Sequence, residues 1–463
     1  MLCELYGVLH KFAKKVLGRS NFNLNQYRMV NFTDRDFDTN GCVTIRNNSK
    51  KSFINEYEYD VKQLTVLKSN VYPVENLVPV ESYLELQDSF SDKKRKKKIR
   101  RYNSLAESSI AWESFINNSR IPYGYRNAGL HYAGYIREYE NWCLPSWVWT
   151  NGALVRYYCT LGEIEKAKDM ADIILDLQHD CGGWIVRNDY SSEGIVPVLA
   201  PNDSAYLANN CCLSYYLVTK DEAYLVAAER CAKWIMETAR SDGFVYFGFD
   251  DKRKSWIKDR NIVDIGFTAA LFAKLYEITE KKPYLRFLER FVEKYIELFY
   301  MEENRCFATS IDENNLQIGG AFGRGQAWAL EGLIPTYQVT GDAHIKNVIQ
   351  STIQTLLDKQ DKNGGWSYNL VKPLMGTDCK GTPVIARSIM EWYFINPDQH
   401  NLYKSAEKAL NWCVNHTDSS GESKGGIFSY TIEGAVVHHM YTNTAFVYAS
   451  SYALEVKHML EEI

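Results

Sequence analysis

The chain has 463 residues, of which 46% are hydrophobic and 24% are charged, the composition of an ordinary globular protein. Its formal net charge of −4 gives the molecule no electrostatic reason to bind nucleic acid. The sequence contains no run of about 18 uninterrupted apolar residues, which excludes a conventional transmembrane helix.

Residues 1–18 (MLCELYGVLHKFAKKVLG) combine apolar positions at helical spacing with a lysine face. They lack the small-residue cleavage site of a signal peptide, so they predict a docked surface helix, with a peripheral membrane anchor as the alternative. The eleven cysteines show no CxxC spacing, which argues against a secreted disulfide framework. We therefore expect a cytoplasmic protein.

Residues 1–102 are polar and predict a partly irregular N-terminal extension. Alternating residues within it indicate short strands at 41–47 and 56–67. The basic run KKRKKKIRR (93–101) predicts a solvated linker or helix start, and a patch for nucleic acid or anionic lipid is the minority alternative. Residues 103–463 are expected to form the main domain.

The main domain repeats a pair of helices joined by a short turn. Successive joints lie roughly 55–60 residues apart, at 159–167, 217–225, 277–285, 338–346 and 394–402. The second helix of each pair is amphipathic, as in residues 223–239. A glycine-aromatic turn follows most of them, at 182–184, 242–244, 364–366 and 425–428, where glycine supplies a positive φ.

The first helix of each pair is apolar or small on nearly every side, so it should be buried on every side. These segments are 147–161, 204–218, 267–279, 327–339, 384–396 and 442–456. Six buried helices with amphipathic partners predict an all-α fold, an (α/α)6 toroid whose outer ring is closed by residues 104–117. An open solenoid of the tetratricopeptide type is the alternative, but its repeats are shorter, about 34 residues.

In such a toroid the inner helices run in the same direction, so the residues at their starts share one mouth. The residues expected there are Trp147, Asn151, Asp203, Asp264, Arg324, Gln326, Trp328, Asp378, His438, His439 and Asn443. Carboxylates, an arginine, amides and aromatic rings would converge, and the helix N-termini would favour a bound anion.

Each of these residues also has a purely structural interpretation. Aspartate is a preferred N-cap, so Asp203, Asp264 and Asp378 could each serve only to begin a helix. Asp264 is flanked by Ile262, Val263, Ile265 and Phe267, which predict burial. Apolar surroundings favour the protonated carboxyl, which can then act as a general acid. The histidine pair has no third ligand at metal spacing, and no phosphate loop, GxSxG or HExxH motif is present.

The stretch GRGQAWAL (323–330) resembles the RGQAWA motif of unsaturated glucuronyl hydrolases, glycoside hydrolase family 88, and of the related family 105. The resemblance covers about residues 105–463 and implies an (α/α)6 barrel with two aspartates at the starts of two earlier inner helices. Asp203 and Asp264 lie one and two repeats before the motif, where those aspartates are expected.

The resemblance implies a glycoside hydrolase whose substrate is an oligosaccharide ending in a Δ4,5-unsaturated uronic acid, with no cofactor or metal. Asp264 would protonate C4 of the enol ether and Asp203 would hold or tune it. Arg324 and Gln326 would bind the sugar, and Trp147 and Trp328 would stack on it or shape the pocket. The substrate-binding set would also include Asn151, Asp378, His439 and Asn443.

This sequence departs from the family pattern at two points. Glu331 stands where the motif commonly continues with tyrosine, and residues 280–323 lack the histidine that assists catalysis in family 88. Two alternatives therefore stay open. One is a uronic-acid epimerase or lyase on the same barrel, with His438, Tyr206 or Tyr441 as the base. The other is a barrel without catalysis that binds glycan or a partner protein.

Overall fold

The computed structural model describes residues 42–48, 53–60, 65–73, 102, 104–121, 129–136, 141–143, 147–191, 194–251, 253–258, 260–371, 377–428 and 444–463. The expected surface helix at 1–18 and the basic run at 93–101 lie outside these residues. Strands were predicted in the N-terminal extension, and β1 (Cys42–Asn48), β2 (Phe53–Asp60) and β3 (Thr65–Pro73) form an antiparallel sheet in that order. The second predicted segment, 56–67, therefore covers parts of two strands.

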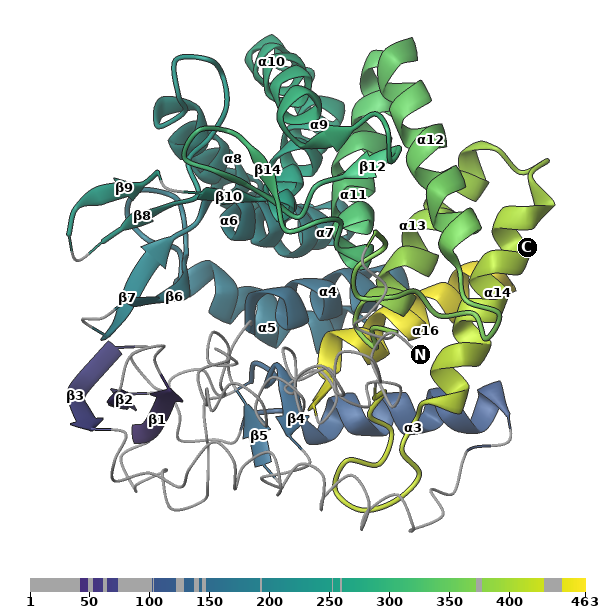
Figure 1. Cartoon of the computed structure of the whole chain (residues 1–463), viewed down its shortest axis with the longest axis horizontal. Helices are drawn as coiled ribbons and strands as arrows, with labels where there is room; N and C mark the ends of the chain where they lie inside the picture. Colours follow the sequence, from purple (N-terminus) through teal and green to yellow (C-terminus); the bar gives the residue numbers. More distant parts are fainter. Residues whose placement is uncertain are drawn as a thin grey trace, which may run out of the picture.

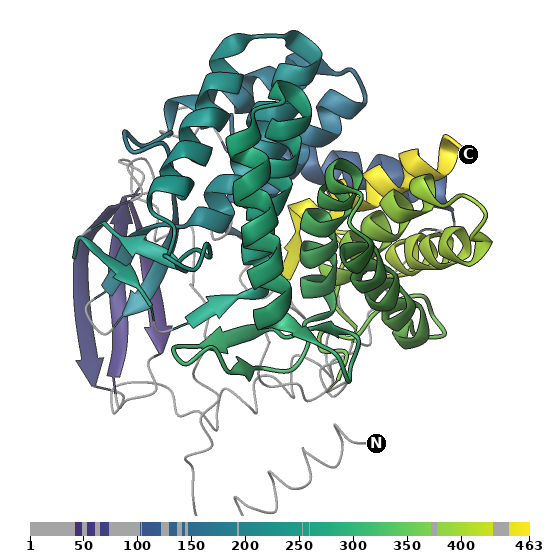
Figure 2. The same cartoon turned by 90° about the horizontal axis from the view of Figure 1, so that it is seen from above.

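An inner ring of helices forms the centre of the main domain (Figures 1 and 2). Each member contacts the next, and the last returns to the first, so the ring is closed. Its members are α4 (Trp147–Thr160), α6 (Pro201–Leu207) with its continuation, α9 (Phe267–Thr279), α11 (Gly323–Thr340), α13 (Gly381–Ile395) and α16 (Val447–Glu461). The continuation of α6 is a π-helix, η3 (Ala208–Leu213), followed by α7 (Ser214–Thr219). The predicted (α/α)6 toroid is confirmed.

The outer ring consists of amphipathic helices that each bury one face against an inner helix. They are α5 (Ile164–Asp176), α8 (Glu222–Glu237), α10 (Lys282–Phe299), α12 (Ala343–Lys359), α14 (His400–Asn415) and α3 (Leu105–Asn118). Helix α3 packs on α16 and α14, so the N-terminal side closes the ring as predicted. Of the helices described, none is long and apolar enough to cross a membrane.

The glycine-aromatic turns have the positive φ that was predicted for their glycines. Gly182 and Gly364 have φ of 103° and 99°, and a Cβ at either position would lie within 2.5 Å of a carbonyl oxygen on the next outer helix. The tryptophans that follow, Trp184 and Trp366, are fully buried, and each indole donates a 2.7 Å hydrogen bond to a carbonyl oxygen of the preceding outer helix. The same pair of contacts, a glycine against the next outer helix and an indole hydrogen bond to the preceding one, therefore joins consecutive repeats at two points of the ring.

Short strands occupy the connections that lead from an outer helix to the next inner helix. A four-stranded sheet contains β6 (Ile185–Ser191), β7 (Gly194–Leu199), β8 (Gly248–Asp250) and β9 (Ser255–Ile257). A second sheet joins β10 (Arg260–Ile262), β13 (Ser310–Asp312) and β14 (Gln317–Ile318), and β11 (Tyr300–Met301) pairs with β12 (Cys306–Phe307). These strands were not predicted, because the helical repeat dominates the pattern.

The start of the last inner helix was predicted wrongly. Residues 444–446 were expected to be helical, but they form β15 (Thr444–Phe446), which pairs with β4 (Gly134–Ile136). Strand β4 also pairs with β5 (Asn141–Cys143). The backbone N–H of Val447 donates to the carbonyl of Ala133 at 2.9 Å, so pairing with the segment before α4 delays the helix until Val447.

Candidate active site

The two predicted acidic residues lie at the starts of neighbouring inner helices. Asp203 is the third residue of α6, and Asp264 lies in a 3-10 helix, η4 (Val263–Gly266), that continues directly into α9. Both residues are only 3% exposed. Helix α6 packs against both η4 and α9, so the fold brings the segments that carry the two carboxylates into contact.

Asp203 is held by a tryptophan that the sequence analysis did not select. The indole Nε1 of Trp149 donates to Oδ1 of Asp203 at 2.8 Å, and the ring lies 5.2 Å from that of Trp328. Trp147, the predicted residue, begins α4, but its side chain lies outside the described part.

Asp264 is positioned by close packing around η4. The hydroxyl of Tyr295 on α10 donates to the carbonyl of Val263 at 2.7 Å. Burial raises the pKa of Tyr295 well above its usual value, and the nearby Asp264 adds to the effect, so the phenol stays protonated. On the other side, a Cβ at Gly332 of α11 would lie 2.3 Å from the carbonyl oxygen of Gly266. Glycine thus allows α11 to approach the backbone next to Asp264.

Arg324 is the second residue of α11 and is 4% exposed. Its guanidinium carbon lies 5.1 Å from the ring centroid of Trp328 and 5.4 Å from that of Tyr368, and Nη1 lies 3.4 Å from Oδ2 of Asp378. Oδ1 of Asp378 accepts the backbone N–H of Lys380 at 3.0 Å. The positive charge is therefore fixed among aromatic faces beside the start of α11.

Two predicted sugar-binding amides have structural partners instead. Gln326 is fully buried; its Oε1 accepts the N–H of Phe307 at 2.6 Å, and its Nε2 donates to the carbonyls of Phe307 and Phe322. Asn151, also fully buried, bonds through both amide ends to the backbone N–H and C=O of His131. These bonds brace chain segments against α11 and α4, so the predicted sugar contacts of both amides are not supported.

The remaining predicted residues have different outcomes. His438, His439, Tyr441 and Asn443 lie outside the described residues. Tyr206, an alternative base, is 1% exposed, and its hydroxyl lies 3.3 Å from the carbonyl oxygen of Trp149. Burial raises its pKa well above the usual value, which makes proton abstraction by this phenolate unfavourable.

Asn202, directly before Asp203, is a residue that sequence reasoning missed. It is 1% exposed, and neither its amide oxygen nor its amide nitrogen has a hydrogen-bond partner in the structure described. A buried amide without partners is rare, because each unmade hydrogen bond costs about 1–3 kcal/mol. Asn202 therefore has an amide oxygen and an amide nitrogen, near the start of α6, that form no hydrogen bond within the described structure.

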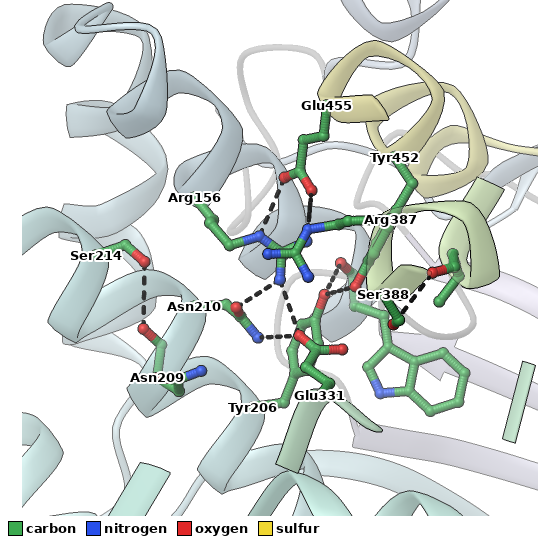
Figure 3. Close-up of polar contacts among 12 residues, drawn as sticks. Arg156, Tyr206, Asn209, Asn210, Ser214, Glu331, Arg387, Ser388, Tyr452 and Glu455 are labelled. Atoms are coloured by element: carbon green, nitrogen blue, oxygen red, sulfur yellow. Dashed lines mark hydrogen bonds and ion pairs between the residues drawn. The ribbon is translucent and has the colours of Figure 1, made fainter. Parts of the chain in front are cut away.

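A network of buried charges lies among the inner helices (Figure 3). Arg156 of α4 contacts Glu331 of α11 and Glu455 of α16, each at 2.9 Å, and its Nη1 donates to Asn210 of η3 at 2.6 Å. Arg387 of α13 bonds to Glu455 at 2.5 Å. Each of these residues interrupts an apolar helix, which was the sequence signal that could have revealed them.

The network reaches Asp203 through two tyrosines and a tryptophan. The guanidinium of Arg156 lies 4.9 Å from the ring centroid of Tyr452, whose hydroxyl lies 3.2 Å from that of Tyr206. Tyr206 in turn bonds to the backbone of Trp149, which holds Asp203. Figure 3 shows Tyr206 and Tyr452 converging beside the charged side chains.

Comparisons with known proteins agree with the toroid described above. Residues 133–456 match the family model described as Glycosyl Hydrolase Family 88. A search of curated proteins gave no match. Among solved structures, the unsaturated glucuronyl hydrolase of Bacillus sp. GL1, responsible for degradation of glycosaminoglycan, is 15% identical, with a TM-score of 0.59 over 76% of this chain and 96% of that one.

Two further structures show the same fold. An unsaturated glucuronyl hydrolase specific for heparin is 15% identical, with a TM-score of 0.61 over 77% of this chain and 97% of that one. Cellobiose 2-epimerase from Bacillus thermoamylovorans is 11% identical, with a TM-score of 0.59 over 78% of this chain and 99% of that one. At these identities the likeness supports the six-hairpin toroid alone.

Proposed function

Because this chain belongs to glycosyl hydrolase family 88, we propose that it hydrolyses oligosaccharides that end in a Δ4,5-unsaturated uronic acid. The observation that carries the proposal is the pair of buried carboxylates, Asp203 and Asp264, on inner-helix starts that pack together. Arg324, which lies over Trp328 and pairs with Asp378, supplies a fixed positive charge suited to the uronate carboxylate.

In the proposed reaction the carboxyl of Asp264 gives its proton to C4 of the C4=C5 enol ether. The positive charge that develops is shared by C5 and the ring oxygen, and water adds at C5 while Asp264 takes back a proton. The resulting hemiketal opens to a ketone at C5 and a hemiacetal at C1. The hemiacetal then breaks its bond to the next sugar and releases that sugar with a free hydroxyl.

The other residues have supporting roles in this proposal. Asp203 holds the substrate and tunes Asp264, and its own position depends on the hydrogen bond from Trp149. Trp328, 5% exposed and 5.2 Å from Trp149, gives the sugar an aromatic wall. Both carboxylates act in surroundings from which water is largely removed, which strengthens electrostatic interactions with the transition state.

The test is turnover of unsaturated disaccharides made by a polysaccharide lyase, followed by the loss of the ultraviolet absorbance of the C4=C5 bond. Asp264→Asn should abolish turnover while leaving the thermal unfolding temperature and substrate binding near those of the wild type. Undiminished turnover by Asp264→Asn would rule out the assigned acid. Deuterium uptake at C5 of an intact polymer, without loss of absorbance, would favour the epimerase alternative.

A further inference from the structure

A pocket of about 260 Å³ lies next to the segments that lead to Asp264 and Arg324. One wall comes from β10 and the residues just before it, which continue into η4. Another comes from β13 and the turn after it, which continue towards α11. Strands β10 and β13 are hydrogen-bonded to each other, so the two walls form one unit.

The pocket is close to the candidate active site. Asn261 in its wall precedes Asp264 by three residues, and three residues of extended chain span at most about 10 Å. Directly before β13, the hydroxyl of Thr309 accepts the backbone N–H of Phe322, the residue before α11, at 3.0 Å. The backbone that lines the pocket is therefore continuous with the backbone that carries Asp264 and tied to the start of α11.

The lining has the mixed chemistry that a sugar ring requires. Lys258 lies 5.4 Å from the ring centroid of Tyr246, and Arg260 lies 4.9 Å from that of Phe247, which gives cationic donors set on aromatic faces. Asp312, the cross-strand partner of Arg260, adds a carboxylate, of which Oδ1 accepts the backbone N–H groups of Asn314 and Leu316. Hydroxyl groups both donate and accept, whereas a simple anion would meet the carboxylate at a cost in energy.

Asn261 gives a second, independent indication of a ligand. The residue is 4% exposed; its Nδ2 donates to the carbonyl of Val245 at 2.9 Å, but its Oδ1 has no hydrogen-bond partner in the described structure. Buried acceptors without partners are uncommon in folded proteins. The pocket is also slightly smaller than the roughly 300–1,000 Å³ typical of drug-sized ligands, which fits one sugar unit.

We propose that this pocket is a distal sugar-binding site, which holds a further sugar of an oligosaccharide whose unsaturated end occupies the candidate active site. The proposal rests on the proposed function and adds a preference for chain length. Binding of a remote sugar supplies energy that orients the reacting ring, so longer substrates should have the higher kcat/KM.

The test compares an unsaturated disaccharide with an unsaturated tetrasaccharide from the same lyase digest. The wild type should prefer the tetrasaccharide. The double variant Lys258→Ala/Arg260→Ala should lower kcat/KM for the tetrasaccharide by about tenfold and leave the disaccharide value unchanged. The matched control is Lys282→Ala, because Lys282 of α10 lies 5.3 Å from the ring centroid of Tyr276 of α9 but does not line the pocket.

Equal losses on both substrates, or no loss on either, would overturn the distal site. If the proposed function is wrong, no unsaturated oligosaccharide will be turned over, which distinguishes this outcome from failure of the distal site. In that event calorimetry with a saturated tetrasaccharide tests whether the pocket binds sugar. Binding that the double variant weakens by about tenfold supports the site, and absent or unchanged binding overturns it.

Discussion

Arg156 and Glu455 join the first and last inner helices through two parallel hydrogen bonds. Nε donates to Oε1 at 3.1 Å and Nη2 donates to Oε2 at 2.9 Å (Figure 3). Both side chains are at most 10% exposed. A planar guanidinium matches a carboxylate in this geometry, so the pair fixes the register at which α16 closes the ring against α4.

Arg156→Met should destabilise the protein by about 3–5 kcal/mol, because it removes the cation that contacts Glu331 in the interior and leaves Glu455 with Arg387 alone. Urea unfolding followed by circular dichroism measures the loss. The control is Arg120→Met, which breaks a 2.6 Å ion pair with Asp169 whose side chains are 53% and 62% exposed. That change should cost at most about 1 kcal/mol. Similar costs for both variants would show that the buried pair has no special role.

Trp149→Phe should lower kcat while leaving stability nearly intact. The phenyl ring keeps most of the aromatic packing against Trp328, but Oδ1 of Asp203 loses a donor at 2.8 Å. Hydrogen bonds to charged groups contribute about 1.5–3 kcal/mol, so kcat on an unsaturated disaccharide should fall roughly 10- to 100-fold.

The control for this variant is Trp392→Phe, in α13. Trp392 is 1% exposed and packs against Tyr337, at a ring separation of 5.9 Å. It should affect stability more than kcat. If Trp149→Phe kept full activity, the inferred role of Trp149 in positioning Asp203 would be wrong.

The toroid could be predicted from the sequence because burial of whole helices leaves a clear pattern. Segments such as 267–279 are apolar on every side and form α9 over the same residues. The start of α16 could not be predicted, since pairing of β15 with β4 joins residues about three hundred positions apart. Tertiary contacts of this kind override local helix propensity.

The candidate site could be predicted only in part, for a related reason. The register of the repeats selects Asp203 and Asp264, but it does not reveal which way a side chain points at a helix start. Gln326 was expected to meet a sugar, yet its amide bonds to the backbone at Phe307. That partner belongs to a short β-hairpin that the helical pattern conceals.

His131 should make stability depend on pH in the mildly acidic range. Burial lowers its pKa from 6.5 in the unfolded chain to about 4 in the folded one. Between these two pH values the unfolded chain binds more protons than the folded chain. The stability contributed by neutral His131 is therefore complete above about pH 6.5 and decreases by about 1.4 kcal/mol for each unit by which the pH is lowered. The loss is nearly complete at about pH 4 and amounts to about 3 kcal/mol.

Urea unfolding at several pH values measures this effect of His131. In His131→Asn the slope of unfolding free energy against pH should decrease by about 1.4 kcal/mol per pH unit over this range, which corresponds to the uptake of one proton. The same substitution at His344, which is exposed, is the control. An unchanged slope in His131→Asn would contradict the burial of a neutral imidazole.

Asn202→Leu should raise stability and weaken substrate binding. The amide of Asn202 is 1% exposed and has no partner among the described residues, so a leucine of similar size removes the cost of two unmade hydrogen bonds. The unfolding free energy should increase by about 1–2 kcal/mol. In the enzyme the same amide would meet a hydroxyl of the substrate beside Asp203, so KM should rise about tenfold with little change in kcat.

Ser204→Ala provides the opposite control, two residues along the same helix. The hydroxyl of Ser204 accepts the backbone N–H of Trp184 at 3.0 Å, and the residue is fully buried. Its loss should lower stability by about 1–3 kcal/mol and leave KM unchanged. If Asn202→Leu were destabilising and KM were unaffected, the amide would have a structural role. A stabilised variant with a raised KM would instead show that Asn202 is kept unpaired for the substrate, because only a ligand then uses the hydrogen bonds that the folded chain leaves unmade.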